Sequence, residues 1–422
     1  MPARAEDAGH KRTIEQVLTI NCGSSSLKFA VYFTAGSDAA GGADARAALR
    51  YAGEVERIGS GDALLHVTES GGQSLARQNM ALTDHTAALH AVLDWLEGWP
   101  DALTPDAVGH RIVHGGSVYD RPQPITPRVI ETLRQLAPLA PLHMPIEIAA
   151  IEALQARYPA VPQVACFDTA FHRTMPRVAQ IFGLPRPITE SGVLRYGFHG
   201  LSYEYILSEL GREASDAGKS LEAYAGRRIV IAHLGNGASM VAVRDGRSVD
   251  TTMGLTPIGG LVMGARSGDL DPGVLLYLLD AERMSAADLR KQVEQEGGLL
   301  GVSGGSSDMR DLLSRMADDS HAEEAVDLFC YTARKYLGAL VSVLGGIDTL
   351  VFTGGIGEHA AEVRRRICSD LAFLGIRLEP ARNDASARII SEEASPVAVR
   401  VMHTNEEAMI ARHTVRILCS AC

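Results

Sequence analysis

The sequence predicts an α/β fold built from two related halves. Residues 16–32 and residues 228–243 share one layout, namely a β-prone strand, a glycine-rich polar turn and a second β-prone strand. Aligning Gly23 with Gly235 superimposes the two segments, and the shift between them is half the chain length. A chain of 422 residues is long enough for two domains, each with its own core. We therefore expect an internal duplication in which each half opens with the same β-hairpin.

The turns of both hairpins are suited to binding an anion. The first turn carries Ser24, Ser26 and Lys28, so hydroxyls, backbone N–H groups and a positive charge can converge on one ligand. The second turn consists of His233, Leu234, Gly235, Asn236 and Gly237. Either turn alone also fits an ordinary polar hairpin loop, but the repetition favours phosphate binding. Two such turns facing each other across a cleft would hold one polyphosphate.

A third glycine-rich turn follows the apolar strand expected at residues 349–352. It consists of Gly354, Gly355, Ile356, Gly357 and Glu358. Glycines at this point would let the backbone approach a ligand closely. No GxxxxGK[ST] pattern accompanies the first turn, so the site is not a Walker A loop.

Composition excludes several classes of partner. The formal charge is −11 and no basic stripe is present, which argues against nucleic acid. No apolar run reaches the roughly 20 residues that span a bilayer, and the polar N-terminus lacks the apolar core of a signal peptide. Six scattered cysteines fit a reducing cytoplasm, and the CxxC formed by Cys419 and Cys422 is either a metal or redox pair or two incidental thiols. We expect a cytoplasmic enzyme.

Strands and a helix lead to the first candidate binding residue. Strand-like runs near 50–57 and 63–68 precede an amphipathic helix over 83–97. A short strand at 110–113 then places Arg111 and Val113 on one face. An arginine fork at a strand end could clamp a carboxylate or phosphate, although a surface ion pair is the alternative.

Two further polar residues stand where structure breaks. A proline-rich loop over 138–145, with Leu142 near its tip, precedes a helix over 146–157. The buried strand at 164–172 breaks at Asp168, where an acid either binds a metal, orients a charge or caps a helix. His199 lies between two glycines before a helix beginning at Ser202, which favours function over a core position.

The second half contains a long irregular segment. Residues 251–273 hold many glycines together with Pro257 and Arg266, and a loop of this length is commonly functional. A glycine–serine turn at 299–311 runs into a helix and could contact an anion. A long helix over 322–343 and a last strand at 397–401 follow, and residues 404–407 cap a final helix that runs through Arg416.

These segments together resemble the acetate kinase family. The resemblance is carried, in order, by INCGSSSLKF, HRIVHGG, FDTAFH, RYGFHG, HLGNG, TPIGGLVMGARSGDLDP, SSDMRDL, FTGGIGE and TNEE. It implies two ribonuclease H-like domains of the actin-like ATPase type around a nucleotide cleft. The lobes would comprise residues 1–168 with 405–422, and residues 169–404, the latter supplying nucleotide and dimer contacts. It also implies reversible phosphoryl transfer between ATP and acetate, giving ADP and acetyl phosphate, with Mg²⁺ (Mn²⁺ as a substitute) and a homodimeric assembly.

The resemblance also implies roles for individual residues. Asn21 and Glu406 would hold Mg²⁺, while Ser24, Ser26 and Lys28 would face the phosphates. Arg111 and Arg266 would grip the carboxylate and the moving phosphoryl group, His199 would donate to that group, and Asp168 would be the essential acid. ATP would contact His233, Leu234, Gly235, Asn236, Gly237, Asp308, Met309, Arg310, Gly354, Gly355, Ile356, Gly357 and Glu358. The acyl pocket would be lined by Arg111, Val113, Leu142, Phe198 and Pro257.

Three other functions share parts of this pattern. A propionate kinase would keep every motif and differ in pocket volume; with Val113 as a mid-sized wall, we expect acetate first, propionate tolerated and butyrate poor. A sugar or hydroxyl kinase would use Asp168 as a base, because a hydroxyl, unlike a carboxylate, must lose a proton. A chaperone-like or filament-forming relative would hydrolyse ATP slowly and respond to a protein partner.

Overall fold

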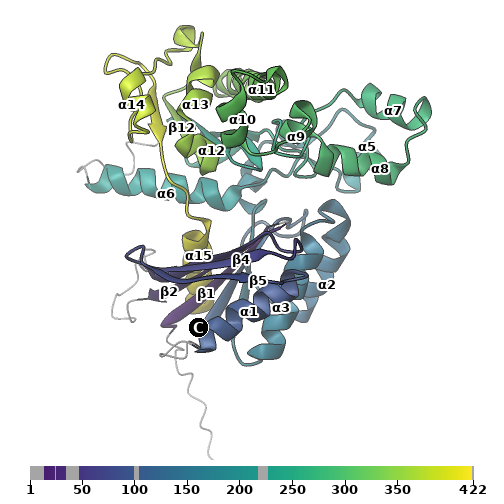
Figure 1. Cartoon of the computed structure of the whole chain (residues 1–422), viewed down its shortest axis with the longest axis vertical. Coiled ribbons are helices and arrows are strands. Elements are labelled where there is room, and N and C mark those ends of the chain that lie inside the picture. Colours follow the sequence, from purple (N-terminus) through teal and green to yellow (C-terminus); the bar gives the residue numbers. More distant parts are fainter. Residues whose placement is uncertain (1–13, 24, 35–46, 99–103, 217–226, 421–422) are drawn as a thin grey trace, which may run out of the picture. The chain divides into compact units, whose positions relative to one another are not determined.

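The computed structural model describes residues 14–23, 25–34, 47–98, 104–216 and 227–420. The described parts of residues 1–170 and 405–422 form one compact unit, and the described parts of residues 171–404 form the other (Figure 1). The sequence placed the boundaries at 168/169 and 404/405. We call the two units unit 1 and unit 2.

Unit 1 is built on a sheet of eight strands in the order β5-β4-β3-β2-β1-β6-β8-β7. Its strands are β1 (Gln16–Cys22), β2 (Leu27–Thr34), β3 (Ala47–Glu56), β4 (Ala63–Glu69), β5 (Ser74–Met80), β6 (Ala107–Ile112), β7 (Gln123–Pro124) and β8 (Gln163–Phe167). Its helices are α1 (His85–Gly98), α2 (Pro127–Leu136), the 3₁₀ turn η1 (Ala137–Leu139), α3 (Met144–Arg157) and α15 (Glu406–Ser420). The 3₁₀ turn η2 (Ala170–Thr174) follows β8 and spans the boundary between the units.

Helices cover both faces of this sheet. Leu18 and Val108 join α1 and α3 in one core cluster. The next residue, Gly109, faces α15, where a Cβ atom would lie 2.3 Å from Thr414 Oγ1 and 2.5 Å from Ile410 Cγ2. Because successive strand residues point to opposite faces, α15 packs against the face opposite α1 and α3 (Figure 1). Gly109 is what allows this helix to approach so closely.

Unit 2 is built on a sheet of five strands in the order β11-β10-β9-β12-β13. Its strands are β9 (Arg228–Leu234), β10 (Ala238–Arg244), β11 (Arg247–Thr251), β12 (Thr349–Thr353) and β13 (Ala398–Val401). Its first helices are α4 (Arg177–Gln180), α5 (Arg186–Glu190), α6 (Gly200–Asp216), α7 (Pro272–Asp280), α8 (Ala286–Lys291), the π-helical turn η4 (Gln292–Glu296) and α9 (Gly298–Ser303). The later ones are α10 (Met309–Arg315), α11 (Ser320–Leu344), α12 (Gly354–His359), α13 (Ala361–Cys368), the 3₁₀ turn η5 (Ala372–Leu374) and α14 (Pro380–Asp384).

The two sheets share one topology, which confirms the predicted duplication. In unit 1, β1 and β2 form an antiparallel hairpin, β3 continues it, and β6 and β8 follow on the other side of β1 in parallel. In unit 2, β9, β10, β11, β12 and β13 occupy the same places with the same directions. Gly23 and Gly235 each follow the last residue of the first strand, as the alignment required. This is the ribonuclease H-like arrangement of an actin-like ATPase domain, present twice.

Several predictions of local structure were wrong. The proline-rich loop was expected through 145, but α3 begins at Met144 because Pro145 lies in its first turn, where a missing N–H costs nothing. The segment 299–311 was expected to open with a turn, yet its first part belongs to α9. The third glycine-rich turn is helical and forms α12. The strand β5 was not predicted; four of its seven residues are polar or charged and the same four are exposed, so its apolar alternation is weak.

Candidate active site

In unit 1, polar residues gather where three parallel strands end. Asn21 lies near the end of β1, Arg111 near the end of β6, and Asp168 directly after β8. These strands are parallel neighbours, so their carboxyl ends meet at one edge of the sheet. Arg111 donates from Nε and Nη2 to Asp168 Oδ2 at 3.0 and 2.6 Å, and from Nη1 to Asn21 Oδ1 at 3.4 Å. We call these residues, together with Glu406, the strand-end cluster.

Burial makes the pair of Arg111 and Asp168 strongly coupled. Asp168 is fully buried, and the arginine side chain is 12% exposed. Burial alone would lower the pKa of Arg111, but the carboxylates of Asp168 and Glu406 outweigh it and raise that pKa. The arginine is therefore a permanent cation in a fixed orientation. Because both side chains are largely or fully buried, the pair is not the surface ion pair that was the alternative for Arg111.

The first turn of α15 brings two acids to the same edge. Asn21 Nδ2 donates to Glu406 Oε2 and to Glu407 Oε1, each at 3.1 Å. Asn405 Oδ1 accepts from the backbone N–H of Ala408 at 2.8 Å and so caps the helix. Carboxylates in a first helical turn are favoured by the helix dipole. Sequence reasoning identified Glu406 but missed Glu407, whose signal was its position in the same turn.

Lys28 lies across the hairpin from Asn21, with which it is paired in the register of β1 and β2. Burial lowers the pKa of its ammonium group, but Glu54, Glu407 and Glu406 more than offset this and raise it. Lys28 therefore stays charged at the edge that the acids occupy. Ser24 lies outside the described residues, and the backbone oxygen of Ser26 accepts from Gly23 N at 2.8 Å, which closes the turn.

Oxygen ligands for a divalent cation are present in this cluster. Mg²⁺ prefers hard oxygen donors and is commonly bound through one or two carboxylates plus phosphate oxygens and waters. The carboxylates of Glu406 and Glu407 supply such donors beside the Asn21 amide, whose oxygen accepts from Arg111 Nη1. Within the described ranges, no group of three or more His, Cys, Asp or Glu residues could enclose a metal by itself. The donor set therefore fits a cation that a phosphate helps to hold.

A buried acid behind the strand end was missed by sequence reasoning. Glu147 on α3 is 2% exposed, and its two carboxylate oxygens accept from the backbone N–H of Val113 at 3.2 and 3.1 Å. Burial raises the pKa of Glu147 to about 8, against the lowering effects of Arg111 and of the Val113 N–H. The only sequence signal was an acid between two isoleucines, Ile146 and Ile148. Leu142, which was expected to line the acyl pocket, is half-buried.

In unit 2, the second hairpin turn lies beside an imidazole and a guanidinium. A Cβ atom built on Gly237 would lie 3.3 Å from His199 Nε2 and 3.6 Å from Arg266 Nη1. The rings of His199 and His233 stack with centroids 4.3 Å apart. His199 is 8% exposed and has a positive φ of 59°. The sequence assigned His199, His233 and Arg266 separately, but the structure makes them neighbours around Gly237. We call these three residues the hairpin-turn cluster.

The loop that carries Arg266 is tied to the same hairpin turn. Arg266 Nη1 donates to the carbonyl oxygen of Pro257 at 3.0 Å. Gly264 N donates to Asn236 O at 3.0 Å, and a Cβ atom on Gly264 would overlap Asn236 Oδ1 at 1.9 Å. The irregular segment predicted from its glycines therefore has a fixed path, and that path aims Arg266 at Gly237.

The third glycine-rich segment forms the first turn of α12 and lies against β9. Gly354 has a φ of 77°, and a Cβ atom there would lie 2.8 Å from Leu234 O. Glu358 Oε1 accepts from Gly354 N at 2.9 Å, and its other oxygen contacts His403 Nδ1 at 2.7 Å. Burial would raise the pKa of Glu358, but His403 and the backbone N–H groups lower it. The carboxylate thus closes its own helical turn.

Comparison with known proteins identifies the family. Residues 16–412 match the acetokinase family. The chain belongs to this family. It is 47% identical to an acetate kinase of Rhodopseudomonas palustris over 403 residues, which cover 95% of this chain and 98% of the relative. Among solved structures, acetate kinase from Porphyromonas gingivalis is 36% identical with a TM-score of 0.81, and a propionate kinase from Francisella tularensis is 34% identical with a TM-score of 0.83; both alignments cover 96% of this chain and 100% of the other.

The remaining residues expected to bind nucleotide in this acetokinase differ in exposure. Asp308 accepts from the backbone N–H of Arg310 at 2.8 Å and so caps α10. The Arg310 side chain is 89% exposed, whereas Met309 is 3% exposed. Phe198, expected to line the acyl pocket, is 1% exposed, and its carbonyl oxygen accepts from His172 Nε2 at 2.9 Å. These assignments stay predictions.

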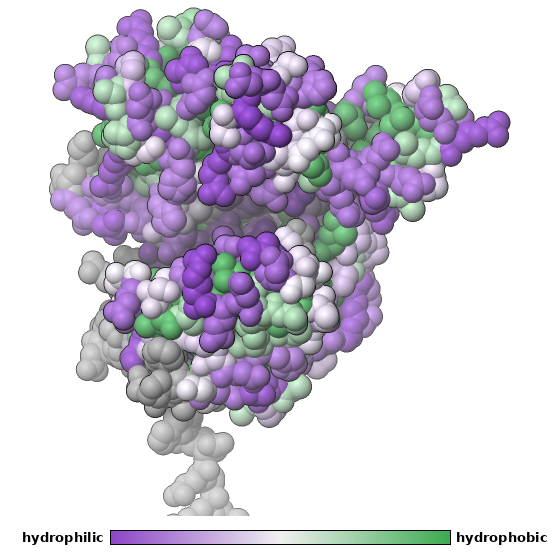
Figure 2. Space-filling model, viewed as in Figure 1, coloured by the Kyte–Doolittle hydropathy of each residue, from purple (hydrophilic) through white to green (hydrophobic). Residues whose placement is uncertain are grey.

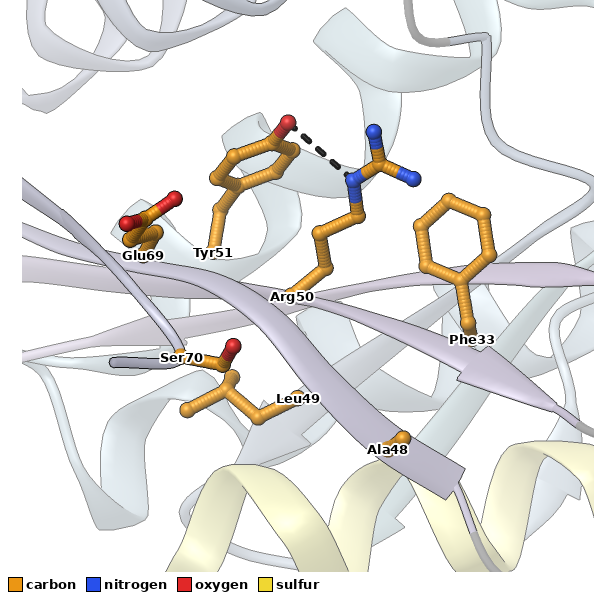
Figure 3. A pocket seen from close by; sticks show the side chains of 7 residues that line it. All are labelled: Phe33, Ala48, Leu49, Arg50, Tyr51, Glu69 and Ser70. Atoms are coloured by element: carbon orange, nitrogen blue, oxygen red, sulfur yellow. Dashed lines mark hydrogen bonds between the residues drawn. The ribbon is translucent and has the colours of Figure 1, made fainter. Parts of the chain in front are cut away.

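A hollow of about 360 Å³ lies on β2, β3 and β4 of the acetokinase, and Figure 3 shows the side chains that line it. Arg50 lies in it, with Cζ 4.8 Å from the centroid of the Phe33 ring and Nε donating to Tyr51 Oη at 3.1 Å. Phe33 pairs with Gln16 at the start of β1, so the hollow lies at the sheet edge opposite Asn21. It is not part of the strand-end cluster.

Within the described ranges, no helix combines the length and the apolar character needed to cross a membrane.

Proposed function

We propose that this acetokinase transfers the γ-phosphoryl group of ATP to acetate, giving ADP and acetyl phosphate, and that it catalyses the reverse reaction. The observation that carries the proposal is the fixed Arg111, which is buried, held by Asp168 and placed beside oxygen donors for a cation. A planar guanidinium in this setting is suited to a carboxylate. Family membership and the acetate kinases among its relatives support the same reaction.

In this reaction Asp168 orients Arg111 and does not act as a base. Acetate is already an anion at pH 7, so no proton has to leave before it attacks. Asp168 Oδ2 accepts both arginine N–H bonds, and the residue is fully buried. Removing the acid would leave a buried cation with a poorly fixed fork. Arg111 would hold the carboxylate so that one oxygen points along the line of attack.

The hairpin-turn cluster would bind the phosphoryl group. A phosphoryl group in transfer passes through a loose transition state that needs positioning and neutralisation of charge. Arg266 Nη1 and His199 Nε2 both lie beside Gly237, so a donor and a cation are available where a phosphate oxygen could approach the backbone. An arginine in that role contributes about 10³–10⁵ in rate.

Asn21 and Glu406 would hold Mg²⁺, with Glu407 in reach of Asn21. The bound cation would neutralise phosphate charge. Lys28 would add a further positive charge at this edge, and its raised pKa keeps it protonated across the physiological range.

Propionate is the second candidate acceptor, because the propionate kinase of Francisella tularensis is among the similar structures. Val113 would form one wall of the acyl pocket, and Glu147 fixes its backbone. We expect acetate to be the better substrate, with propionate accepted. A kcat/KM that is higher for propionate would reverse this assignment.

Acetate-dependent release of ADP, measured with a coupled assay and with hydroxylamine trapping of the acyl phosphate, tests the proposal. We expect both signals from the wild-type protein with acetate and neither with a sugar. Asp168→Asn should lower kcat strongly, while Asp370→Asn, whose side chain is 88% exposed, is the matched control. ATP turnover that ignores acetate would refute the proposal, and activity retained in Asp168→Asn would refute the role of that acid.

We also propose that the protein is a homodimer that uses unit 2, as the sequence predicted. Helix α7 has no buried residue, although it carries Val274, Leu276 and Tyr277, which are 41%, 60% and 58% exposed. Figure 2 shows hydrophobic surface in the region of α5 and α7. Light scattering after size exclusion should give twice the chain mass of 45.0 kDa, and Leu276→Glu should lower it. A monomer in the wild type would exclude the dimer. Cytoplasmic location stays a prediction.

A further inference from the structure

His199 has an unusual backbone that its surroundings must stabilise. Its φ of 59° is in the left-handed region, which a residue other than glycine rarely adopts. Gly197, two residues earlier, also has a positive φ of 76°. Such conformations persist where neighbouring groups fix them, and they are frequent at functional sites. The contacts of the His199 ring are therefore informative.

Two buried hydroxyls in series hold one nitrogen of this ring. Ser239 Oγ lies 2.8 Å from His199 Nδ1, and the hydroxyl of Tyr203 on α6 contacts the same Ser239 Oγ. Ser239 and Tyr203 are both fully buried. The Tyr203 ring is fixed in turn by edge contact with His172, with centroids 5.7 Å apart, and by Phe171 at 6.1 Å. The order Tyr203, Ser239, His199 is thus a built chain of hydrogen bonds.

The chemistry of the hydroxyls favours one direction for this chain. A serine hydroxyl has one proton, so Ser239 can donate to only one of its two neighbours. A phenol is a stronger donor than an aliphatic alcohol, and hydrogen bonds that run in one direction polarise one another. Tyr203 therefore donates to Ser239, and Ser239 donates to His199 Nδ1. In the neutral ring the proton of His199 is then on Nε2.

We propose that Tyr203 is a positioning residue that selects the tautomer of His199 with its proton on Nε2. Nε2 is the ring atom that approaches Gly237, where a Cβ atom would be only 3.3 Å away. The imidazole thus presents a donor toward the hairpin turn, where His233 stacks on it and Arg266 adds a cation. Its use as a donor to a phosphoryl oxygen rests on the proposed function, but the tautomer itself does not.

Nitrogen-15 NMR of protein labelled at histidine tests the tautomer directly. Spectra are recorded near pH 9, where an ordinary imidazole is neutral, and the His199 signals are assigned by their loss in His199→Gln. We expect Nε2 to carry the proton in the wild type. In Tyr203→Phe, which removes only the hydroxyl, the population with the proton on Nδ1 should rise. A wild-type ring protonated on Nδ1, or a ratio unchanged in Tyr203→Phe, would overturn the proposal.

Kinetics supply the second readout. Tyr203→Phe should lower kcat about 10-fold with KM for ATP and acetate changed less than 2-fold, because a donor to the transition state is weakened while substrate contacts remain. Tyr205→Phe on the same helix is the matched control, since Tyr205 is only partly buried where it packs against the hydrophobic core of unit 2. If Tyr203→Phe fails to fold, Ser239→Ala must give the same shift in tautomer. A wild type without kinase activity would refute the function and leave the NMR test intact.

Discussion

Arg364 is a fully buried arginine that contacts backbone carbonyls instead of an acid. Its guanidinium donates to Gly357 O and Glu358 O, each at 2.9 Å, and to Asn383 O at 2.7 Å. It also donates to Asn383 Oδ1 and Ser386 Oγ, each at 2.9 Å. Burial lowers the pKa of Arg364, as expected for a cation without a paired carboxylate. The residue thus supports the C-terminal end of α12.

Arg364→Met should destabilise the protein by about 3 kcal/mol. The change leaves three buried carbonyl groups without this donor, and each such group costs roughly 1–3 kcal/mol. Removing a charge that was costly to bury offsets part of the loss. For a domain of this size, about 3 kcal/mol corresponds to a fall in Tm of roughly 6–12 °C. The KM for ATP should rise as well, because α12 carries the third glycine-rich segment.

Calorimetry of both variants measures the effect. Arg365→Met is the matched control, since the side chain of Arg365 is 61% exposed and pairs with Glu362 at the surface, where an ion pair contributes about 0–1 kcal/mol. A Tm for Arg364→Met that equals that of the control would refute the reasoning. A large loss of stability with an unchanged KM for ATP would refute the proposed support of α12 by Arg364.

Three further predictions concern Gly237, Glu147 and Val113. Gly237→Ala should lower activity at least 10-fold, because the new methyl group contacts the His199 ring at 3.3 Å, whereas Gly338→Ala, placed in open space, should retain it. Because the folded-state pKa of Glu147 is about 8 against an ordinary 4.5, its contribution to stability is present below pH 4.5 and is lost as pH rises through 8. In urea unfolding, the free energy of unfolding of the wild type should fall by roughly 3–5 kcal/mol relative to that of Glu147→Gln between pH 4.5 and 9. Glu152→Gln is the surface control on α3. A wild type and a Glu147→Gln variant with the same dependence of stability on pH would contradict this. Val113→Ala should raise kcat/KM for butyrate relative to acetate, and an unchanged ratio would remove Val113 from the pocket.

Patterns local in sequence predicted the framework well. Both hairpins, the long helix α11 and the break after β8 were evident because β-prone runs, helical periodicity and glycine turns act over a few residues. The proximity of Asn21, Arg111 and Asp168 could also be predicted, since each lies at or just after the end of a strand and the ends of parallel strands meet at one edge of the sheet. The parallel arrangement of these strands thus brings residues that are far apart in sequence into one cluster.

Contacts between distant or buried polar groups could not be predicted. Glu147 and Val113 are separated by 34 residues, and nothing in the sequence pairs an acid on a helix with one backbone N–H. Arg364 is followed by Arg365 and Arg366, and no local pattern distinguishes the buried arginine from the other two. The turn at 354–358 became helical because Glu358 accepts from the N–H of Gly354, which offsets the poor helix propensity of glycine. Each of these depends on the packed environment.

The return of α15 to unit 1 has a consequence for biosynthesis. Residues 405–422 belong to unit 1, although every strand of its sheet precedes residue 171. Within this unit, α15 contacts β1, β6 and β8. A ribosome therefore translates all of unit 2 before the first sheet receives the helix that covers one of its faces. Glu406 and Glu407 arrive with that helix, so a nascent chain lacks the carboxylates of the proposed cation site. We expect chains cut before residue 405 to be both inactive and prone to aggregation through the uncovered sheet.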